Sequence, residues 1–225
     1  MAKVKRIKKK LRIKRFLIFL LIIGIFGVIF YSIMDIPINN IIVKGNSLLT
    51  EQEVIEIAKF KDDSSFIKTS SFITKKRLIK SPIIKEAKVH KKLLNNIEIV
   101  IKEKKPLYLK ESDNVVILED KTEIENHNYS VPILVGDIPP AKYNSFVRQM
   151  KKIETSVLKE VSEIYYKPTE IDEDRFLLAM NDGNYVYLTL TKFNYLNYYD
   201  DMLPEFNGRK GVLYLDSGNT FQIKE

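Results

Sequence analysis

The hydrophobic pattern of the chain begins with one long uncharged run, from Phe16 to Met34. A helix of these nineteen residues would be roughly 28 Å long at about 1.5 Å per residue, which matches the hydrocarbon thickness of a bilayer. A cleaved signal peptide has a shorter apolar region, of about 7–15 residues, followed by small residues, and this run ends without such a site. The pattern predicts an uncleaved transmembrane signal anchor. We expect Phe16, Leu20, Ile25, Ile29 and Met34 to lie in the membrane as part of this anchor.

Beyond the anchor, shorter patterns indicate alternating strands and helices. Ile36 to Lys44 is rich in β-branched residues and ends at the turn signal Gly45-Asn46, which predicts a strand. Thr50 and Glu53 have the spacing of a capping box, in which the threonine hydroxyl accepts the Glu53 amide and the glutamate returns to the Thr50 amide. Apolar residues then recur at helical spacing, so we expect a helix from Thr50 to about Phe60.

A second helix is predicted from about Ser70 to Lys80. Its expected apolar face consists of Phe72, Leu78 and Ile79, although these residues recur less regularly than those of the first helix. Pro82 ends it, because the residue before a proline disfavours the helical conformation.

Two strands follow the second helix, near Ile84–Lys91 and Asn96–Lys104. In the later strand, isoleucines alternate with mostly polar neighbours, as expected when one face of a sheet is buried. The alternating isoleucines are Ile97, Ile99 and Ile101. The predicted order is β-α-α-β-β, in a domain that we place at residues 36–105.

Residues 106–225 predict a second, β-rich domain with packed helices. Apolar residues recur every three or four positions from Pro139 to about Val161, which predicts one long amphipathic helix. Asn181-Asp182-Gly183-Asn184 is a strong hairpin signal, because these residue types tolerate positive φ. The other expected elements are strands at Val115–Leu118, Phe176–Met180, Tyr185–Leu190, Gly211–Asp216 and Thr220–Lys224, and a short helix at Lys192–Leu203 closed by Pro204.

Charge is concentrated at the N-terminus. Nine lysines and arginines precede Phe16, whereas the rest of the chain carries 28 basic and 29 acidic side chains, so the pI of 9.3 does not indicate a nucleic-acid-binding domain. The positive-inside bias therefore predicts a cytoplasmic tail at residues 1–15 and a type II, single-pass protein whose remaining residues lie outside. The residues expected to fix this topology and to contact anionic lipid are Lys8, Lys9, Lys10, Arg12, Lys14 and Arg15.

Candidate chemistry is scarce in this sequence. The absence of cysteine excludes disulfides, thiolate metal sites and cysteine nucleophiles, and the two histidines lack partners at ligand spacing. No pattern for a serine nucleophile or a phosphate-binding loop is present. Asp172, Asp174, Asn181 and Asp182 lack the spacing of a calcium loop and are interpreted as turn residues. We expect no catalytic residue, no metal and no cofactor, which weighs against a membrane-anchored cell-wall hydrolase or transferase.

Tyrosine is the one residue type with an uneven distribution in the outer part. Six of the twelve tyrosines fall between positions 185 and 214. They either pack the second domain or form a binding surface, because tyrosine offers a large rigid area with one polar end.

Several short motifs, in order, resemble a POTRA domain of the FtsQ/DivIB family of bacterial cell-division proteins. They are Ile42-Val43-Lys44-Gly45-Asn46, Leu49-Thr50-Glu51-Gln52-Glu53-Val54, Ile84-x-x-Ala87-x-Val89, Ile97-Glu98-Ile99 and Glu103-Lys104-Lys105-Pro106. The later passage Val131-Pro132-Ile133-Leu134-Val135-Gly136 resembles the family's second module. One departure is Leu93-Leu94-Asn95-Asn96, in a turn where the family usually has a proline.

The resemblance implies a non-enzymatic membrane scaffold of the division machinery, concentrated at the septum. It implies partners of the FtsL and DivIC/FtsB kinds and, through them, the septal peptidoglycan synthases. The region that matches the family's partner-binding segment comprises Val212, Leu213, Tyr214, Leu215, Asp216, Ser217 and Gly218, with Tyr214 and Leu215 as the expected contacts. We expect the last strands to act as an open sheet edge to which a partner adds a strand. The alternative is a membrane-anchored POTRA-type accessory of envelope assembly or secretion.

Overall fold

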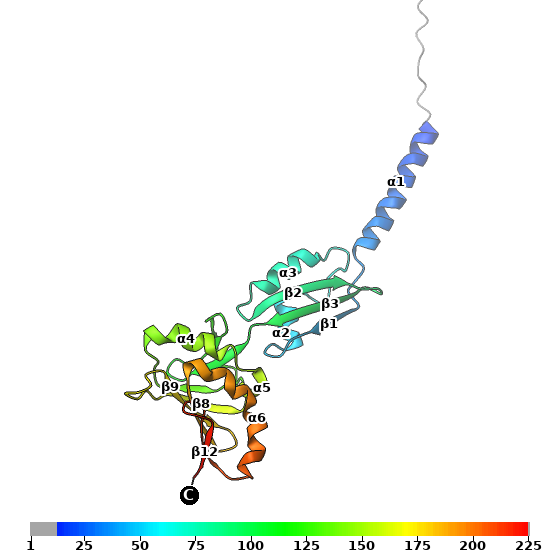
Figure 1. The fold of residues 1–225 in the computed structure, drawn as a ribbon. Helices are drawn as coiled ribbons and strands as arrows, with labels where there is room; N and C mark the ends of the chain where they lie inside the picture. The colour runs from blue at the N-terminus through cyan, green and yellow to red at the C-terminus, as the bar shows by residue number, and fades with distance from the viewer. Residues whose placement is uncertain (1–12, 225) are drawn as a thin grey trace, which may run out of the picture. The chain divides into compact units, whose positions relative to one another are not determined.

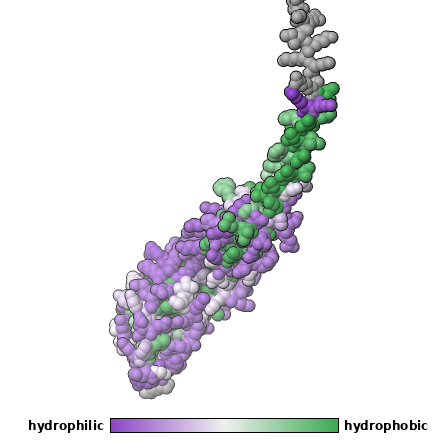
Figure 2. Space-filling view, turned by 90° about the vertical axis from the view of Figure 1, so that its right-hand side faces the viewer, coloured by the Kyte–Doolittle hydropathy of each residue, from purple (hydrophilic) through white to green (hydrophobic). Residues whose placement is uncertain are grey.

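The computed structural model describes residues 13–224, and its first element is α1, Ile13–Met34. This helix has 22 residues, a mean hydropathy of 2.8 in its apolar window, and no buried residue. Figure 2 shows its surface as an almost continuous hydrophobic band. By length and composition α1 is able to cross a membrane, which is consistent with a single-pass anchor. It begins three residues before the predicted run, so that Lys14 and Arg15 lie in its first turn.

The rest of the chain forms two compact units, one ending at Ile101 and the other beginning at Lys102, with Ser81–Lys85 belonging to the second. The first unit has the predicted β-α-α-β-β order (Figure 1). Its elements are β1, Asn40–Lys44; α2, Glu51–Ala58; α3, Ser71–Ile79; β2, Ile84–Lys91; and β3, Asn96–Glu103. The strand order is β1-β3-β2, and β1 runs parallel to β3 with Asn40 opposite Asn96.

Local chemistry explains where α2 begins and ends. The Glu53 amide donates to the Thr50 hydroxyl at 3.2 Å, and the Thr50 amide donates to the Glu53 carboxylate at 2.7 Å, which confirms the capping box. The helix ends at Ala58, where Lys59 takes a left-handed conformation with φ 61°, two residues earlier than expected.

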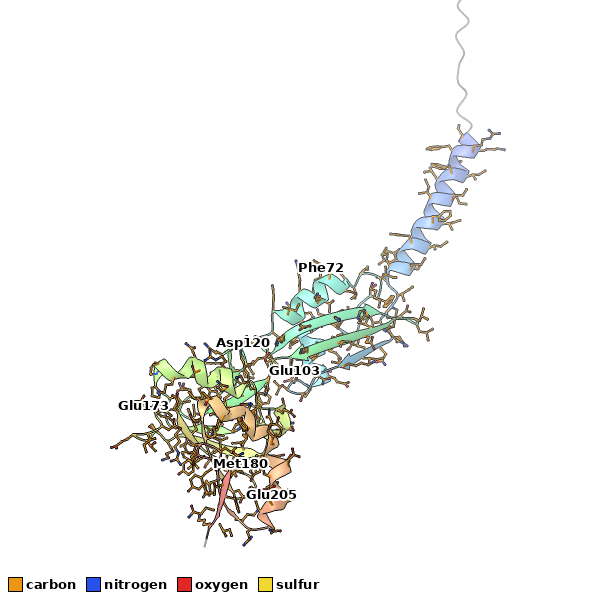
Figure 3. The ribbon with its side chains drawn as sticks, in the orientation of Figure 1. Phe72, Glu103, Asp120, Glu173, Met180 and Glu205 are labelled. Atoms are coloured by element: carbon orange, nitrogen blue, oxygen red, sulfur yellow. The ribbon has the colours of Figure 1, made fainter. Side chains whose placement is uncertain are left out.

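Helix α3 is confirmed, but the expected face of α3 is wrong. Thr74 and Leu78 are its buried residues, whereas Phe72 is 65% exposed and Ile79 is 44% exposed. At about 100° per residue, Phe72 lies about 120° around the axis from Leu78, so the two cannot share a face. Figure 3 shows Phe72 pointing away from the sheet.

Strand β3 forms the centre of the first unit. Ile97, Ile99 and Ile101 are buried, which confirms the alternation. On the other face of β3, the Glu98 carboxylate binds the ammonium groups of Lys44 at 2.7 Å and Lys92 at 2.9 Å. These two hydrogen bonds lower the pKa of Glu98 from its ordinary value of 4.5 to about 2.

The second unit is built on a nine-stranded sheet with the order β12-β11-β10-β9-β8-β7-β4-β5-β6. Helical segments cover one face of the sheet, where Phe146, Phe176 and Phe193 pack ring against ring with centroids 5.2–5.9 Å apart. The strands are β4, Pro106–Lys110; β5, Val115–Leu118; β6, Glu123–Glu125; β7, Ile133–Val135; β8, Val161–Tyr166; β9, Arg175–Met180; β10, Tyr185–Thr189; β11, Gly211–Tyr214; and β12, Thr220–Ile223.

The predicted long helix from Pro139 to Val161 is wrong beyond Met150. The structure has α4, Pro140–Met150, then a turn, then the short α5, Thr155–Leu158, while Val161 begins β8. The side chain of Asn197 stabilises this turn. Its amide nitrogen donates to the Lys152 backbone carbonyl, and its oxygen accepts the backbone N–H of Glu154. The apolar period continues through the break because both helices bury residues in the same core.

The predicted helix at Lys192–Leu203 consists of three shorter segments. They are η1, Leu190–Tyr198; α6, Tyr199–Met202; and η2, Leu203–Phe206, where η denotes a 3₁₀ helix. Pro204 does not close the helix but lies in the first turn of η2, where its missing N–H is not needed.

A buried polar network connects the β9–β10 turn to β11. Asn184 is 1% exposed; its amide nitrogen donates to the Tyr199 hydroxyl at 3.0 Å and the Asp182 carboxylate at 2.8 Å, and its oxygen accepts the Gly211 amide at 2.9 Å. Burial raises the pKa of Tyr199, which keeps its hydroxyl protonated to donate to Asp182 at 2.8 Å. The network therefore holds the start of β11 against the β9–β10 hairpin.

We predict that Asn184→Ala lowers the free energy of unfolding by about 1–3 kcal/mol, because it leaves the buried Gly211 amide without an acceptor. Asn194→Ala, at an exposed asparagine on η1, is the matched control and should change stability by no more than about 0.5 kcal/mol. Chemical denaturation followed by circular dichroism measures both. Equal stability of the two variants would contradict the role of the network.

We also predict that Glu98 makes the first unit sensitive to acid. Because its pKa is lower in the folded chain than in the unfolded one, its contribution is complete above about pH 4.5 and is lost as the pH falls towards 2. Glu98→Gln should therefore flatten the dependence of the melting temperature on pH in this range. Glu86→Gln, an exposed position on β2, should leave the wild-type slope unchanged.

Candidate functional site

The predicted partner-binding segment, residues 212–218, comprises most of β11 and part of the turn to β12. Leu213 and Leu215 are 2% and 0% exposed and belong to the hydrophobic core. Leu215, one of the two expected contacts, is therefore not available to a partner in this structure. The side chains of Val212, Tyr214 and Asp216 are half-buried, and Ser217 and Gly218 are exposed.

Strand β11 is not the edge of the sheet. It pairs in parallel with β10, where Tyr185 lies opposite Val212, and antiparallel with β12, where Gln222 lies opposite Val212. Within residues 13–224, no strand pairs with the outer side of β12. The open edge expected for the last strands is therefore β12 alone.

The hydrogen-bond pattern shows which backbone groups of this edge are free. The Lys224 amide donates to the Lys210 carbonyl at 3.0 Å, so alternate residues of β12 pair inward with β11. The intervening residues, Phe221 and Ile223, direct their backbone N–H and C=O groups outward. These are the groups that an added strand would bond.

A groove of about 410 Å³, lined by both apolar and polar side chains, adjoins this edge. Its walls include Met202 and Phe206 from the α6–η2 segment and Phe221 and Ile223 from β12. The Phe206 and Phe221 rings stack with centroids 3.9 Å apart, and Ile223 is 42% exposed. Glu205 and Arg209 also line the groove; Figure 3 marks Glu205 on its segment. The groove can accept an apolar side chain from a strand beside β12.

Tyrosines occupy the opposite face of the sheet. The rings of Tyr187 and Tyr214 stack with centroids 5.5 Å apart, and the Arg175 guanidinium lies 3.7 Å from the centre of the Tyr187 ring. Arg175 also binds the Asp216 carboxylate at 2.6 Å, which secures the end of β11. Of the six clustered tyrosines, Tyr199 is buried, Tyr185, Tyr187 and Tyr214 are half-buried, and Tyr195 and Tyr198 are exposed. The cluster thus contributes both to packing and to a surface.

The remaining predicted site residues lie on α1 or before it. Phe16, Leu20, Ile25 and Ile29 are exposed along α1, and Met34 is its last residue. Lys14 and Arg15 lie at its start, whereas Lys8, Lys9, Lys10 and Arg12 are outside the described residues. The residues from 13 to 224 contain no group of three His, Asp or Glu side chains that could hold a metal ion.

The groove was not predicted from the sequence. Met202 and Phe206 approach Phe221 and Ile223 only through tertiary packing, and no local spacing marks that approach. The one available signal was the alternation of Phe221 and Ile223 with polar neighbours in the last strand. Gly211 was also missed, although a β-carbon there would overlap the Gln222 carbonyl oxygen, so that β12 can lie this close only beside a glycine.

Comparison with known proteins identifies similar chains. Residues 36–104 match the model of the POTRA domain, FtsQ-type. The chain is 27% identical to the cell division protein DivIB of Bacillus subtilis over 98% of this chain and 88% of that protein, and 30% identical to DivIB of Geobacillus kaustophilus over 82% and 74% respectively. A solved structure of the major extracytoplasmic domain of DivIB from Geobacillus stearothermophilus is 25% identical and covers 47% of this chain and 96% of that one, with a TM-score of 0.38.

We predict that Gly211→Ala separates β12 from β11. The new methyl group would meet backbone and not the end of a flexible side chain, so the strands must move apart at a cost of about 1–3 kcal/mol. Hydrogen–deuterium exchange should accelerate at residues 220–224 and remain slow in β8 and β9. Val212→Ala, which leaves the backbone approach intact, is the control. Unchanged protection of residues 220–224 in Gly211→Ala would contradict this account.

Proposed function

The chain belongs to the DivIB family of bacterial cell division proteins, and from this premise we propose that it is a non-enzymatic scaffold of the division machinery. The observation that carries the proposal is the free edge of β12 beside a groove whose walls include Met202, Phe206 and Phe221. A scaffold needs a surface that holds another protein without changing it chemically, and an open edge with an adjoining pocket supplies one.

We propose that a partner adds an extended segment to β12 by β-augmentation. The outward backbone groups of Phe221 and Ile223 would pair with the main chain of that segment. Every second side chain of an added strand points to the same face, so one of them would enter the groove against Phe206 and Met202. Main-chain bonds would supply affinity, and the groove would select an apolar side chain.

The tyrosine face would support this site. Tyr214 lies opposite Thr220 in the β11–β12 register, so its ring is within one strand of the proposed edge. Its stacking on Tyr187, and the Arg175–Asp216 ion pair beside it, make this part of the surface rigid before binding. A rigid surface loses little conformational entropy when a partner binds.

The membrane topology and the domain assignment form part of the same proposal. The basic residues before the anchor favour a cytoplasmic N-terminus, with both outer domains, residues 36–105 and 106–225, on the other side of the membrane. By family resemblance, the partners would be bitopic proteins of the FtsL and DivIC/FtsB kinds, acting at the septum and linking the chain indirectly to the septal peptidoglycan synthases.

The partner-binding proposal is tested by Ile223→Pro in the full-length chain. Proline removes an outward N–H without removing a bond of the β11–β12 ladder, and edge strands tolerate it. Affinity for the DivIC/FtsB-like protein of the same organism, measured in nanodiscs, should fall at least about tenfold, equivalent to about 1.4 kcal/mol. Gln222→Ala, which alters a side chain on the opposite face, should bind normally. Unchanged affinity of Ile223→Pro would show that β12 is not the binding edge.

Location separates the division role from the alternative role in envelope assembly. A fluorescent fusion at the N-terminus should form a band at midcell before constriction. An even peripheral signal throughout the cell cycle would favour the envelope-assembly accessory instead.

A further inference from the structure

The tip of the β2–β3 hairpin, residues 92–95, exposes two adjacent leucines. Leu93 is 89% exposed and Leu94 is 80% exposed. Beyond α1, the only large hydrophobic side chain of residues 13–224 that is more exposed is Ile171, at 99%. Single exposed hydrophobic residues are common on protein surfaces, but two at one tip require an explanation.

Strand register places this tip close to the end of α1. Because β1 and β3 are parallel, the start of β3 lies beside the start of β1, and the Asn39 amide donates to the Asn95 carbonyl at 3.0 Å. Asn39 is five residues after Met34, the last residue of α1. Five residues span at most about 18 Å, so Asn39 lies within about 18 Å of the end of α1. The hairpin tip, which is bonded to Asn39, is therefore also close to the end of α1.

A second set of hydrogen bonds links the base of the hairpin to the end of α1. The Ser65 hydroxyl donates to the Met34 carbonyl at 2.6 Å, and the Lys91 ammonium donates to the carbonyl of the next residue, Phe66, at 2.6 Å. The Phe66 amide also donates to the Ile36 carbonyl at 2.8 Å. The base of the hairpin is therefore bonded, through one loop, to the residues at which the chain leaves α1.

Basic side chains accompany the leucines. Lys91 and Lys92 immediately precede Leu93. Lys92 and Lys44 share the single Glu98 carboxylate, so these three side chains keep a net positive charge, whereas Lys68 in the same bonded loop pairs with Asp35 at 2.5 Å. The Lys91 ammonium contacts backbone carbonyls, which do not neutralise its charge. Apolar side chains next to cations are typical of segments that lie at an anionic membrane surface.

The backbone at the tip favours other residues than leucine. Leu94 and Asn95 have φ of 58° and 57°, in the left-handed region that Gly and Asn adopt readily and a larger side chain disfavours. Because Leu94 is 80% exposed, burial of its side chain does little to offset this strain. The fold itself therefore gives no reason for a leucine at this position.

We propose that Leu93 and Leu94 insert into the interfacial region of the leaflet at which α1 ends, with Lys91 and Lys92 at anionic headgroups. This inference rests on the proposed role of α1 as a membrane span. The hairpin then forms a second attachment beside the anchor and restricts rotation of the first unit about its short connection to α1. The tip enters only the headgroup boundary, because unpaired backbone groups are not tolerated in the hydrocarbon core.

The test uses single-cysteine variants of the full-length chain, which has no native cysteine. Leu93→Cys and Leu94→Cys, labelled with an environment-sensitive fluorophore, are reconstituted in vesicles of phosphatidylglycerol and phosphatidylcholine that carry a nitroxide near the headgroup. A parallel set of vesicles carries the nitroxide deep on the acyl chain, where it can reach a label in the middle of α1. Lys102→Cys is the matched position on β3, six residues from Asn96 and about 20 Å along the strand. Ile171→Cys controls for an exposed apolar site elsewhere, and Ile25→Cys reports on α1.

The proposal predicts several-fold stronger quenching of the labels at the two leucines than at Lys102 or Ile171, and weaker quenching when phosphatidylglycerol is omitted. If the Ile25 label is quenched and the tip labels resemble Lys102, the insertion is wrong while the anchor stands. If the Ile25 label is not quenched, the anchor and the insertion both fail. A tip label that is shielded from an aqueous quencher but not quenched by the nitroxide lipid would contradict insertion and indicate that the tip contacts a protein.

A second variant separates membrane contact from folding. Leu94→Asn, with the label at Leu93→Cys, should reduce lipid quenching several-fold while the melting temperature stays equal or rises, because Asn suits the left-handed backbone. Phe72→Asn removes another exposed apolar side chain of the first unit and should leave the quenching unchanged. Wild-type quenching in Leu94→Asn would overturn the proposal.

Discussion

The position of the last two strands depends on one buried side chain, Asn184. Its carboxamide is fully paired, with two donated bonds and one accepted bond, and the accepted bond comes from the first residue of β11. A buried amide that is satisfied on both sides fixes orientation more strictly than apolar packing does, because any shift leaves a polar group without a partner. The parallel pairing of β11 with β10, which no tight turn could enforce, is thereby given a definite start.

The proposed binding edge follows from that placement. Once β11 is fixed, Gly211 allows Gln222 to approach closely, and β12 becomes the last strand of the sheet. Phe221 then stacks on Phe206, which joins the strand to the η2 segment and forms one wall of the groove. The groove and the free edge are therefore two results of the same strand placement, and a partner would meet both at once.

Local patterns predicted what local interactions determine. The apolar helix α1, the capping box at Thr50, the alternation of Ile97, Ile99 and Ile101 and the hairpin around Gly183 all depend on residues close in sequence, and all are present. The break after Met150 was missed because Asn197, far along the chain, holds the turn. Likewise, sequence could place strands at both ends of the last turn but could not show which was the edge. That distinction depends on the pairing of β11 with β10. Leu215, which was predicted to be a contact, lies in the core.

Whether an exposed hydrophobic side chain in this protein indicates a binding surface depends on what lies beside it. Phe72 and Ile171 are both strongly exposed, yet Phe72 is covered on one side by the Lys76 ammonium and Ile171 lies in a loop, so neither requires a partner. Ile223 differs because unpaired backbone groups and a groove lie beside it. Leu93 and Leu94 differ because hydrogen bonds tie their hairpin to the residue where α1 ends, and because Leu94 occupies a backbone conformation that favours Asn or Gly. In both cases the side chain is accompanied by a backbone feature that folding alone does not account for, and this combination distinguishes a binding surface from ordinary exposure.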